Sequence, residues 1–144
     1  MNIDIEPTIE DVDNAIGKVT YRDLVSPLDI PPYDRSAVDG YAICSEAVVS
    51  ASPNNPIPLA LKNKGDKISC SEAVPISTGE RLPTGADAVV MVEDTYIDYA
   101  KNLVYVTRPV SKYLNVSRAG EDIRRGDIIV ERGRVLRPWH IAAI

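Results

Sequence analysis

Carboxylates, hydroxyls and glycines gather in three short segments of this chain, and these residue types are the ones best suited to chemistry. The segments are Asp34–Tyr41, Ile76–Glu93 and Arg118–Asp127. Glycine allows the backbone to approach a polar ligand closely, and carboxylate oxygens coordinate hard cations such as Mg²⁺. Together the segments fit a site for a polar ligand and a hard cation. Taken alone, each segment is better explained as a tight turn.

Two other chemistries are disfavoured by the residues present. Ser36 lacks a G-x-S-x-G context and the only histidine, His140, lies near the end of the chain, so a serine hydrolase is not expected. Cys44, Cys70 and His140 are too few for a four-ligand structural zinc site. Both cysteines lie in apolar settings, so we expect reduced, buried thiols and, if any metal binds, a hard cation held by carboxylates.

Composition and charge narrow the function classes further. The chain has 144 residues, of which 44% are hydrophobic and 26% charged, as in a globular protein with a real core. A net charge of −5 argues against general affinity for nucleic acid or anionic membranes. Residues 108–144 carry 8 basic and 4 acidic side chains and so could face an anion. With no long apolar run and an acidic opening, we expect no membrane span and a cytoplasmic location.

The first part of the chain is predicted to contain one short helix, one strand and one stiff loop. A capping-box pattern at Thr8 and a stop at Gly17 predict a helix over 9–16. Alternating β-branched and aromatic residues predict a strand over 18–25. Two prolines, three aspartates and a final Asp-Gly pair predict a fixed, extended loop over 28–40, which could hold carboxylates in place.

Nearly everything else is predicted to be short strands, which makes the fold mainly β, of antiparallel barrel or bent-sheet type. The expected strands cover 40–44, 57–61, 67–77, 86–92, 95–97, 103–107, 127–130 and 134–136. Strand 86–92 is apolar on both faces, which is typical of a central strand. Pro138 is expected to begin a terminal helix.

Considered together, the three segments point to a known family. The string from Ser26 to Ala42, Ser-Pro-Leu-Asp-Ile-Pro-Pro-Tyr-Asp-Arg-Ser-Ala-Val-Asp-Gly-Tyr-Ala, resembles the signature of the molybdopterin molybdenumtransferases, the MoeA family that includes the gephyrin E domain. The other two segments resemble motifs that follow in that family in the same order. The resemblance runs from about Pro7 to the end of the chain.

This resemblance implies part of an enzyme that inserts molybdenum from molybdate into adenylated molybdopterin with Mg²⁺, releasing AMP. The family's functional residues fall on Asp39, Thr78 and Asp122, which we expect to be catalytic. Asp39 is also the expected Mg²⁺ ligand. The neighbouring residues expected to bind substrate are Ser36, Gly79 and Arg118. Where many members have Asn, this chain has Arg35.

The resemblance also implies a domain layout. Residues 7–25 and 123–144 are expected to form one discontinuous linking domain, and residues 34–120 an inserted β domain. The α/β domain that follows in the family is absent from this sequence, so we expect residues 1–144 to be the N-terminal two-domain region, inactive alone and part of a homodimer. Two alternatives stay open: a β scaffold or dimerisation module without a catalytic role, and an unrelated ligand-binding β domain.

Overall fold

A computed structural model describes residues 6–65 and 67–144, so the acidic opening at residues 1–5 lies outside the described residues. The chain divides into two compact units. Unit 1 contains residues 1–30 and 122–144, and unit 2 contains residues 31–121. The assignment of domains at 7–25 with 123–144 and at 34–120 stays a prediction.

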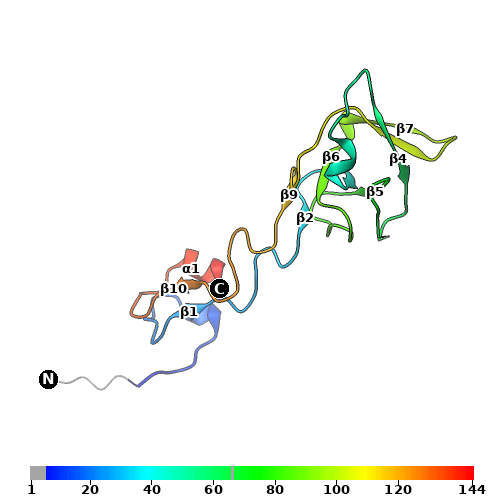
Figure 1. The fold of residues 1–144 in the computed structure, drawn as a ribbon. Helices are drawn as coiled ribbons and strands as arrows, with labels where there is room; N and C mark the ends of the chain where they lie inside the picture. Colours follow the sequence, from blue (N-terminus) through cyan, green and yellow to red (C-terminus); the bar gives the residue numbers. More distant parts are fainter. Residues whose placement is uncertain (1–5, 66) are drawn as a thin grey trace. The chain divides into compact units, whose positions relative to one another are not determined.

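Unit 2 is built on a six-stranded sheet that curls on itself (Figure 1). Its spatial order is β6-β3-β5-β4-β8-β7. The strands are β3 (Gly40–Ile43), β4 (Ile57–Leu61), β5 (Glu72–Ile76), β6 (Ala88–Met91), β7 (Thr95–Asp98) and β8 (Leu103–Val106). Strands β4 and β5 run parallel, and the other neighbours in this sheet are antiparallel. The expected mainly β fold is confirmed.

The core of unit 2 lies on both faces of this sheet. One cluster, which includes Ile43, Leu59 and Val104, is almost completely buried. A smaller cluster around Ala42 and Val89 covers the opposite face. Since successive side chains of a strand point to opposite faces, β3 needs apolar residues at every position, and all four of its residues are buried.

Strand β6 lies at an edge of the sheet, so its prediction as a central strand is wrong. Its apolar character has another cause, because the segment after β8 covers its free edge. The amide of Val89 donates to Leu114 O at 3.1 Å, and Asn115 Nδ2 donates to Val89 O at 2.9 Å. The edge is therefore hydrogen-bonded although no regular strand pairs with it.

The remaining elements of the two units are short. The 3-10 helices are η1 (Val12–Asn14), η2 (Ser45–Val48) and η3 (Val92–Asp94). Two small antiparallel pairs are formed by β1 (Leu24–Val25) with β10 (Ile128–Val130), and by β2 (Arg35–Ser36) with β9 (Val116–Ser117). Helix α1 (Pro138–Ala143) begins at Pro138 as predicted, and the N–H of Arg137 donates to His140 Nδ1 at 3.1 Å. Within the described residues, no helix is long and apolar enough to cross a membrane.

The predicted helix over 9–16 is wrong, because only η1 is helical there. Its apolar residues are poorly covered: Ile9 is fully exposed and Ile16 is 52% exposed. Short helices depend on such packing, so propensity alone does not sustain this one. The strand predicted over 18–25 is limited to β1 and a single bridge between Val19 and Val135. That bridge is also all that remains of the strand predicted over 134–136.

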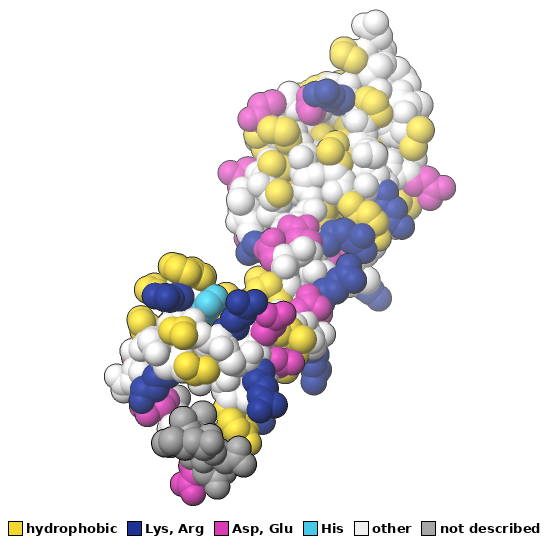
Figure 2. Space-filling view, turned by 90° about the vertical axis from the view of Figure 1, so that its left-hand side faces the viewer, with side chains coloured by type: hydrophobic (Ala, Val, Ile, Leu, Met, Phe, Trp, Pro, Cys, Tyr) yellow, Lys and Arg dark blue, Asp and Glu magenta, His cyan; other side chains and the backbone are white. Residues whose placement is uncertain are grey.

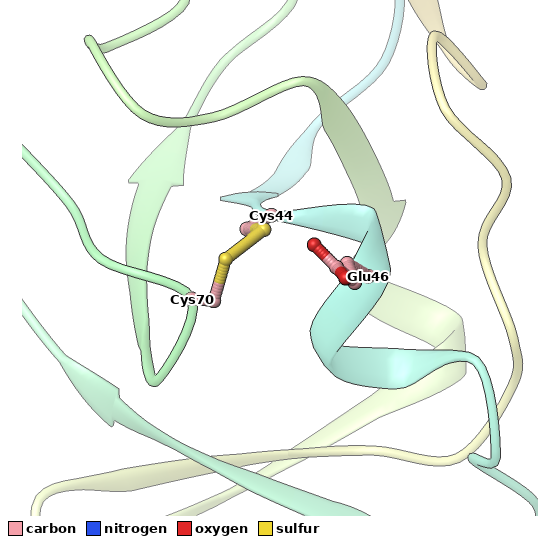
Figure 3. Close-up of side chains that lie close together, drawn as sticks. All are labelled: Cys44, Glu46 and Cys70. Atoms are coloured by element: carbon pink, nitrogen blue, oxygen red, sulfur yellow. A yellow bond between two sulfur atoms is a disulfide. The ribbon is translucent and has the colours of Figure 1, made fainter.

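The prediction of reduced thiols is also wrong, since Cys44 and Cys70 form a disulfide with a Cα–Cα distance of 4.9 Å (Figure 3). Strand register explains the pairing. Ile43 lies opposite Ala73 in the β3–β5 ladder, so the residue after β3 lies beside the turn before β5. The sequence contains both cysteines but does not reveal this register.

Candidate functional site

The antiparallel pairing of β3 and β5 brings Asp39 and Thr78 together across 39 positions of sequence. Gly40, at the start of β3, lies opposite Ile76, at the end of β5. The residue before β3 and those after β5 must therefore be neighbours. Asp39 Oδ1 accepts hydrogen bonds from the Thr78 N–H at 2.8 Å and from Thr78 Oγ1 at 3.2 Å. Both side chains are exposed.

Thr78 occupies a tight turn that the sequence builds locally. Glu80 N donates to Ser77 O at 3.0 Å, and Gly79 has φ 84°, a left-handed value that glycine adopts without strain. The Glu80 carboxylate folds back to accept the Ser77 N–H at 2.7 Å. The turn thus fixes the backbone position of Thr78.

The loop before Asp39 is bonded to this same turn. The amide of Gly79 donates to Ser36 O at 2.8 Å, and the amide of Ser36 donates to Glu80 O at 2.9 Å. Ser36 is buried, and its hydroxyl donates to Val38 O at 2.5 Å. We call Ser36, Asp39, Thr78, Gly79 and Glu80 the Asp39 cluster. Its rigidity comes from two chain segments that hold each other.

Glu80 supplies a second carboxylate to the cluster. Lys64 Nζ lies 2.8 Å from Glu80 Oε1, and this hydrogen bond, with that from the Ser77 amide, holds the pKa of Glu80 below its usual value. The negative charge of Asp39 acts in the opposite direction on the same pKa. Glu80 therefore stays ionised beside Asp39. Since Lys64 balances the charge of Glu80, the Asp39 carboxylate supplies the negative charge that could attract a cation.

A groove of about 450 Å³ adjoins the cluster in unit 2. Gly79 and Glu80 line it together with Lys64 and Arg81. The guanidinium of Arg81 lies 5.3 Å from the centre of the Tyr33 ring, a cation–π distance. The groove thus combines cationic side chains with an aromatic face next to the carboxylates. Figure 2 shows charged side chains of both signs lying side by side on the face in view.

The structure gives Arg118 and Arg35 defined surroundings in unit 2. The guanidinium of Arg118 lies 4.2 Å from the centre of the Tyr113 ring. The Ser117 hydroxyl and the Arg118 N–H donate to Glu121 and lower the pKa of its carboxyl, and the charges of Arg35 and Arg118 add to this effect. Arg35 thus favours the ionised form of Glu121.

Asp122 belongs to unit 1, unlike the other predicted site residues. Its amide donates to Ile30 O at 3.0 Å, which fixes its backbone, and its side chain is exposed. The structure therefore brings Asp39, Thr78, Ser36 and Gly79 together in unit 2, whereas Asp122 stands in the other unit. The roles predicted for these residues, and for Arg118, stay predictions.

Sequence reasoning missed Glu80 and Lys64. Glu80 lay within a recognised segment, and its position three residues after Ser77 is the signal for a turn closed by a carboxylate. Similar turns recur at Ser69–Glu72 and Arg124–Asp127, where the acidic side chain accepts the first amide at 2.8 Å. Lys64 had no such signal, because 16 positions separate it from Glu80.

Comparisons with known proteins agree on the family. The family model for the MoeA N-terminal region (domain I and II) matches residues 2–144. A molybdopterin biosynthesis protein of Methanocaldococcus jannaschii is 38% identical over 131 residues, which is 91% of this chain and 32% of the relative. A molybdopterin molybdenumtransferase of Staphylococcus aureus is 34% identical over 140 residues, which is 92% of this chain and 33% of the relative.

A solved structure from the same family also matches this chain. The crystal structure of the molybdopterin biosynthesis MoeA protein from Pyrococcus horikoshii OT3 matches with a TM-score of 0.83 and 36% identity, covering 92% of this chain and 36% of that one. The chain thus spans about a third of the length of these relatives. On sequence, motif order and fold, it belongs to the MoeA family of molybdenum cofactor biosynthesis proteins and corresponds to their N-terminal region.

Proposed function

We propose that this chain is the N-terminal part of a molybdopterin molybdenumtransferase, which inserts molybdenum from molybdate into adenylated molybdopterin and releases AMP. Family membership supports the reaction class. The observation that carries the proposal is the exposed carboxylate of Asp39, which Thr78 holds through a hydrogen bond of 2.8 Å. Both substrates are anions, so a fixed carboxylate facing them needs a cation or a proton as partner.

The residues of the Asp39 cluster fit the Mg²⁺ that the family resemblance implies. Within the described residues, the hydrogen bonds to the Asp39 carboxylate both end on Oδ1, so Oδ2 is available as a hard oxygen ligand. Mg²⁺ commonly uses one or two carboxylates together with water and substrate phosphate. Asp39 would hold the ion, and its charge would offset that of the phosphate and the molybdate oxygens.

Thr78 and Asp39 can also manage protons and orientation directly. The Thr78 hydroxyl donates to Asp39 at 3.2 Å, a long contact that it can exchange for a substrate oxyanion by rotating. Asp39 keeps the Thr78 amide as a partner during that exchange, because the backbone bond is shorter. The carboxylate therefore stays in place while the hydroxyl moves.

The groove beside the cluster suits the larger substrate. Lys64 and Arg81 offer positive charge and Tyr33 an aromatic face, which together match a phosphate and a flat ring system. The substrate contacts predicted for Ser36 and Gly79 would require these residues to exchange partners, since the Ser36 hydroxyl and both backbone N–H groups donate within the protein. Arg118 and Asp122 remain proposed as further functional residues.

A non-catalytic scaffold is the second candidate, and one observation favours it. The Gly79 amide, expected to donate to an oxyanion, donates to Ser36 O at 2.8 Å, so the turn is satisfied without a ligand. A scaffold needs such a self-contained turn, whereas an oxyanion site needs a free donor.

A chimeric protein distinguishes the two candidate functions. In it, residues 1–144 replace the matched segment of the Staphylococcus aureus molybdenumtransferase and are joined to the remainder of that protein. We expect the folded chimera to insert molybdenum and release AMP, and the isolated chain to do neither. A folded chimera that binds adenylated molybdopterin but inserts no molybdenum would favour the scaffold. Turnover by the isolated chain would contradict the proposed need for the rest of the protein.

We also propose that the protein acts as a homodimer. Unit 1 exposes large apolar side chains: Ile128 is 56% and Trp139 67% exposed, and both line a groove of about 560 Å³. Surfaces of this kind are commonly covered by a partner chain. Light scattering at increasing concentration should give twice the chain mass, and a constant monomer mass would contradict the proposal.

A further inference from the structure

Three side chains with metal-binding atoms converge at one end of the sheet in unit 2, apart from the Asp39 cluster. The sulfurs of Cys44 and Cys70 and a carboxylate oxygen of Glu46 all lie within 4.8 Å of one another. Figure 3 shows the Glu46 carboxylate next to the two sulfurs. Cys44 follows β3, Glu46 lies on η2, and Cys70 precedes β5.

The backbone around all three residues is held by hydrogen bonds. The amide of Ser45 donates to Asp87 Oδ1 at 2.7 Å, which fixes the residue between Cys44 and Glu46. Cys70 lies in a turn in which Ser69 N donates to Glu72 Oε2 at 2.8 Å. Both cysteines therefore keep their positions whether or not the sulfurs are bonded.

A carboxylate lies beside the two sulfurs, which helps to distinguish two uses of a cysteine pair. A pair that exchanges disulfides with other proteins needs nearby cations or a helix N-terminus to stabilise its thiolate. Cys44 is the N-cap residue of η2, but that helix has only four residues and the Cys44 side chain makes no capping hydrogen bond. The Glu46 carboxylate lies within 4.8 Å of both sulfurs, and Asp87 accepts hydrogen bonds from the adjacent Ser45. After reduction, the carboxylate opposes ionisation of the two thiols unless a cation binds between the three groups.

We propose that reduction of the Cys44–Cys70 disulfide creates a binding site for one zinc-class divalent cation, ligated by both thiolates and Glu46. Three protein ligands leave the fourth position of a tetrahedral ion to water. The site is thus different from the four-ligand structural zinc site that the composition excludes. Disulfide and metal exclude each other, because the bonded sulfurs have no thiolate to offer.

The geometry requires only local adjustment. In a tetrahedral zinc site, bond lengths of about 2.3 Å to sulfur and 2.0 Å to oxygen put ligand atoms roughly 3.5–3.8 Å apart. Glu46 and Cys70 are exposed, so their side chains can reach this spacing by rotation, whereas the buried Cys44 stays fixed. The disulfide takes up two electrons and two protons from a dithiol, which itself becomes a disulfide. A phosphine supplies only the two electrons and becomes the phosphine oxide, while water supplies its oxygen and the two protons. Metal binding then releases the two thiol protons to water.

The test is a Co²⁺ titration of the 144-residue chain, reduced with a phosphine that is then removed without oxygen. We expect a thiolate-to-cobalt absorption band that saturates at one ion per chain and disappears on adding Zn²⁺. The oxidised chain should show no band. Absence of the band in the reduced chain, or one ion shared by two chains, would overturn the proposal.

Matched variants test the third ligand. Glu93→Gln is the control, because Glu93 is also exposed and also lies on a short 3-10 helix. It follows Met91, which pairs with Gly40 at the start of β3, whereas Cys44 follows the end of β3. Glu46→Gln should weaken Co²⁺ binding by at least about tenfold, since even outer-shell partners change metal affinity by ~10–100-fold. Equal affinities of the two variants would remove Glu46 from the site, and binding by Cys44→Ser would remove the cysteine pair.

Discussion

Gly40→Ala should be one of the most damaging small substitutions in unit 2. A Cβ at this position would lie 1.9 Å from Val90 O and 2.9 Å from Val90 C, which are backbone atoms of the neighbouring strand. Backbone atoms cannot rotate away as a flexible side chain can. Strand β3 or β6 must therefore move, and Gly40 is paired with Ile76 on one side and with Met91 on the other.

The expected cost is about 3–4 kcal/mol. Overpacking a well-packed site costs typically ~1–3 kcal/mol, and each hydrogen bond weakened by the strand shift adds ~0.5–1.5 kcal/mol. Gly79→Ala is the matched control, because its added Cβ would meet nothing within 4 Å and its cost comes from φ 84° alone. That backbone cost is about 1–2 kcal/mol.

The assay is hydrogen exchange of β3 amides in both variants, together with urea denaturation followed by circular dichroism. Trp139, the only tryptophan, belongs to unit 1, so its fluorescence serves as an internal control for the other unit. We expect the free energy of unfolding of unit 2 to fall further for Gly40→Ala than for Gly79→Ala. Equal losses, or unchanged exchange at β3, would refute the steric reasoning.

Three further outcomes follow from the structure. Replacing both Cys44 and Cys70 by serine should lower the free energy of unfolding by about 3.5 kcal/mol, which is the loop-entropy value for a separation of 26 residues. If denaturation gave the same free energy of unfolding for this variant and for the oxidised chain, the prediction would be contradicted. The pKa of Glu80 is lowered in the folded state, so the ionised carboxylate stabilises the protein above its ordinary pKa of 4.5, and this stabilisation is lost as the pH falls. The difference in free energy of unfolding between the wild type and Glu80→Gln should therefore shrink in acid. A difference that grows as the pH falls would contradict this sign. Ile9→Ala should change stability by less than about 0.5 kcal/mol, because Ile9 contacts solvent, and a larger change in thermal unfolding would show unrecognised packing.

The parts of the fold predicted from sequence are those determined by local pattern. Strands β3, β4 and β8 were found because continuous or alternating apolar residues reflect the faces they bury. The helix over 9–16 failed because a helical pattern needs a surface to pack on, and Ile9 has none. Strand β6 was predicted to be central because its sequence is apolar on both faces. An edge strand that is covered by a loop has the same sequence pattern.

The candidate site was predicted only as a set of residues. The resemblance selected Asp39 and Thr78, but their contact follows from the β3–β5 register, which no local pattern encodes. The same register creates the Cys44–Cys70 disulfide that the sequence argued against. Long-range pairing is thus the information missing from the sequence, and it decides the chemistry at both ends of β3.

The most direct measurement of the central claim is single-turnover AMP release by Asp39→Asn in the molybdenum-inserting chimera, with Asp98→Asn as control. Asp98 also accepts a backbone hydrogen bond in unit 2, from the Lys101 N–H at 3.1 Å, but it lies in the β7–β8 hairpin. Asparagine keeps the shape and loses the charge, so we expect insertion to fall by at least about a hundredfold for Asp39→Asn, the scale of losing one charge-stabilising group. Binding of adenylated molybdopterin and the activity of Asp98→Asn should be retained. Equal insertion rates for the two folded variants would contradict a chemical role for Asp39.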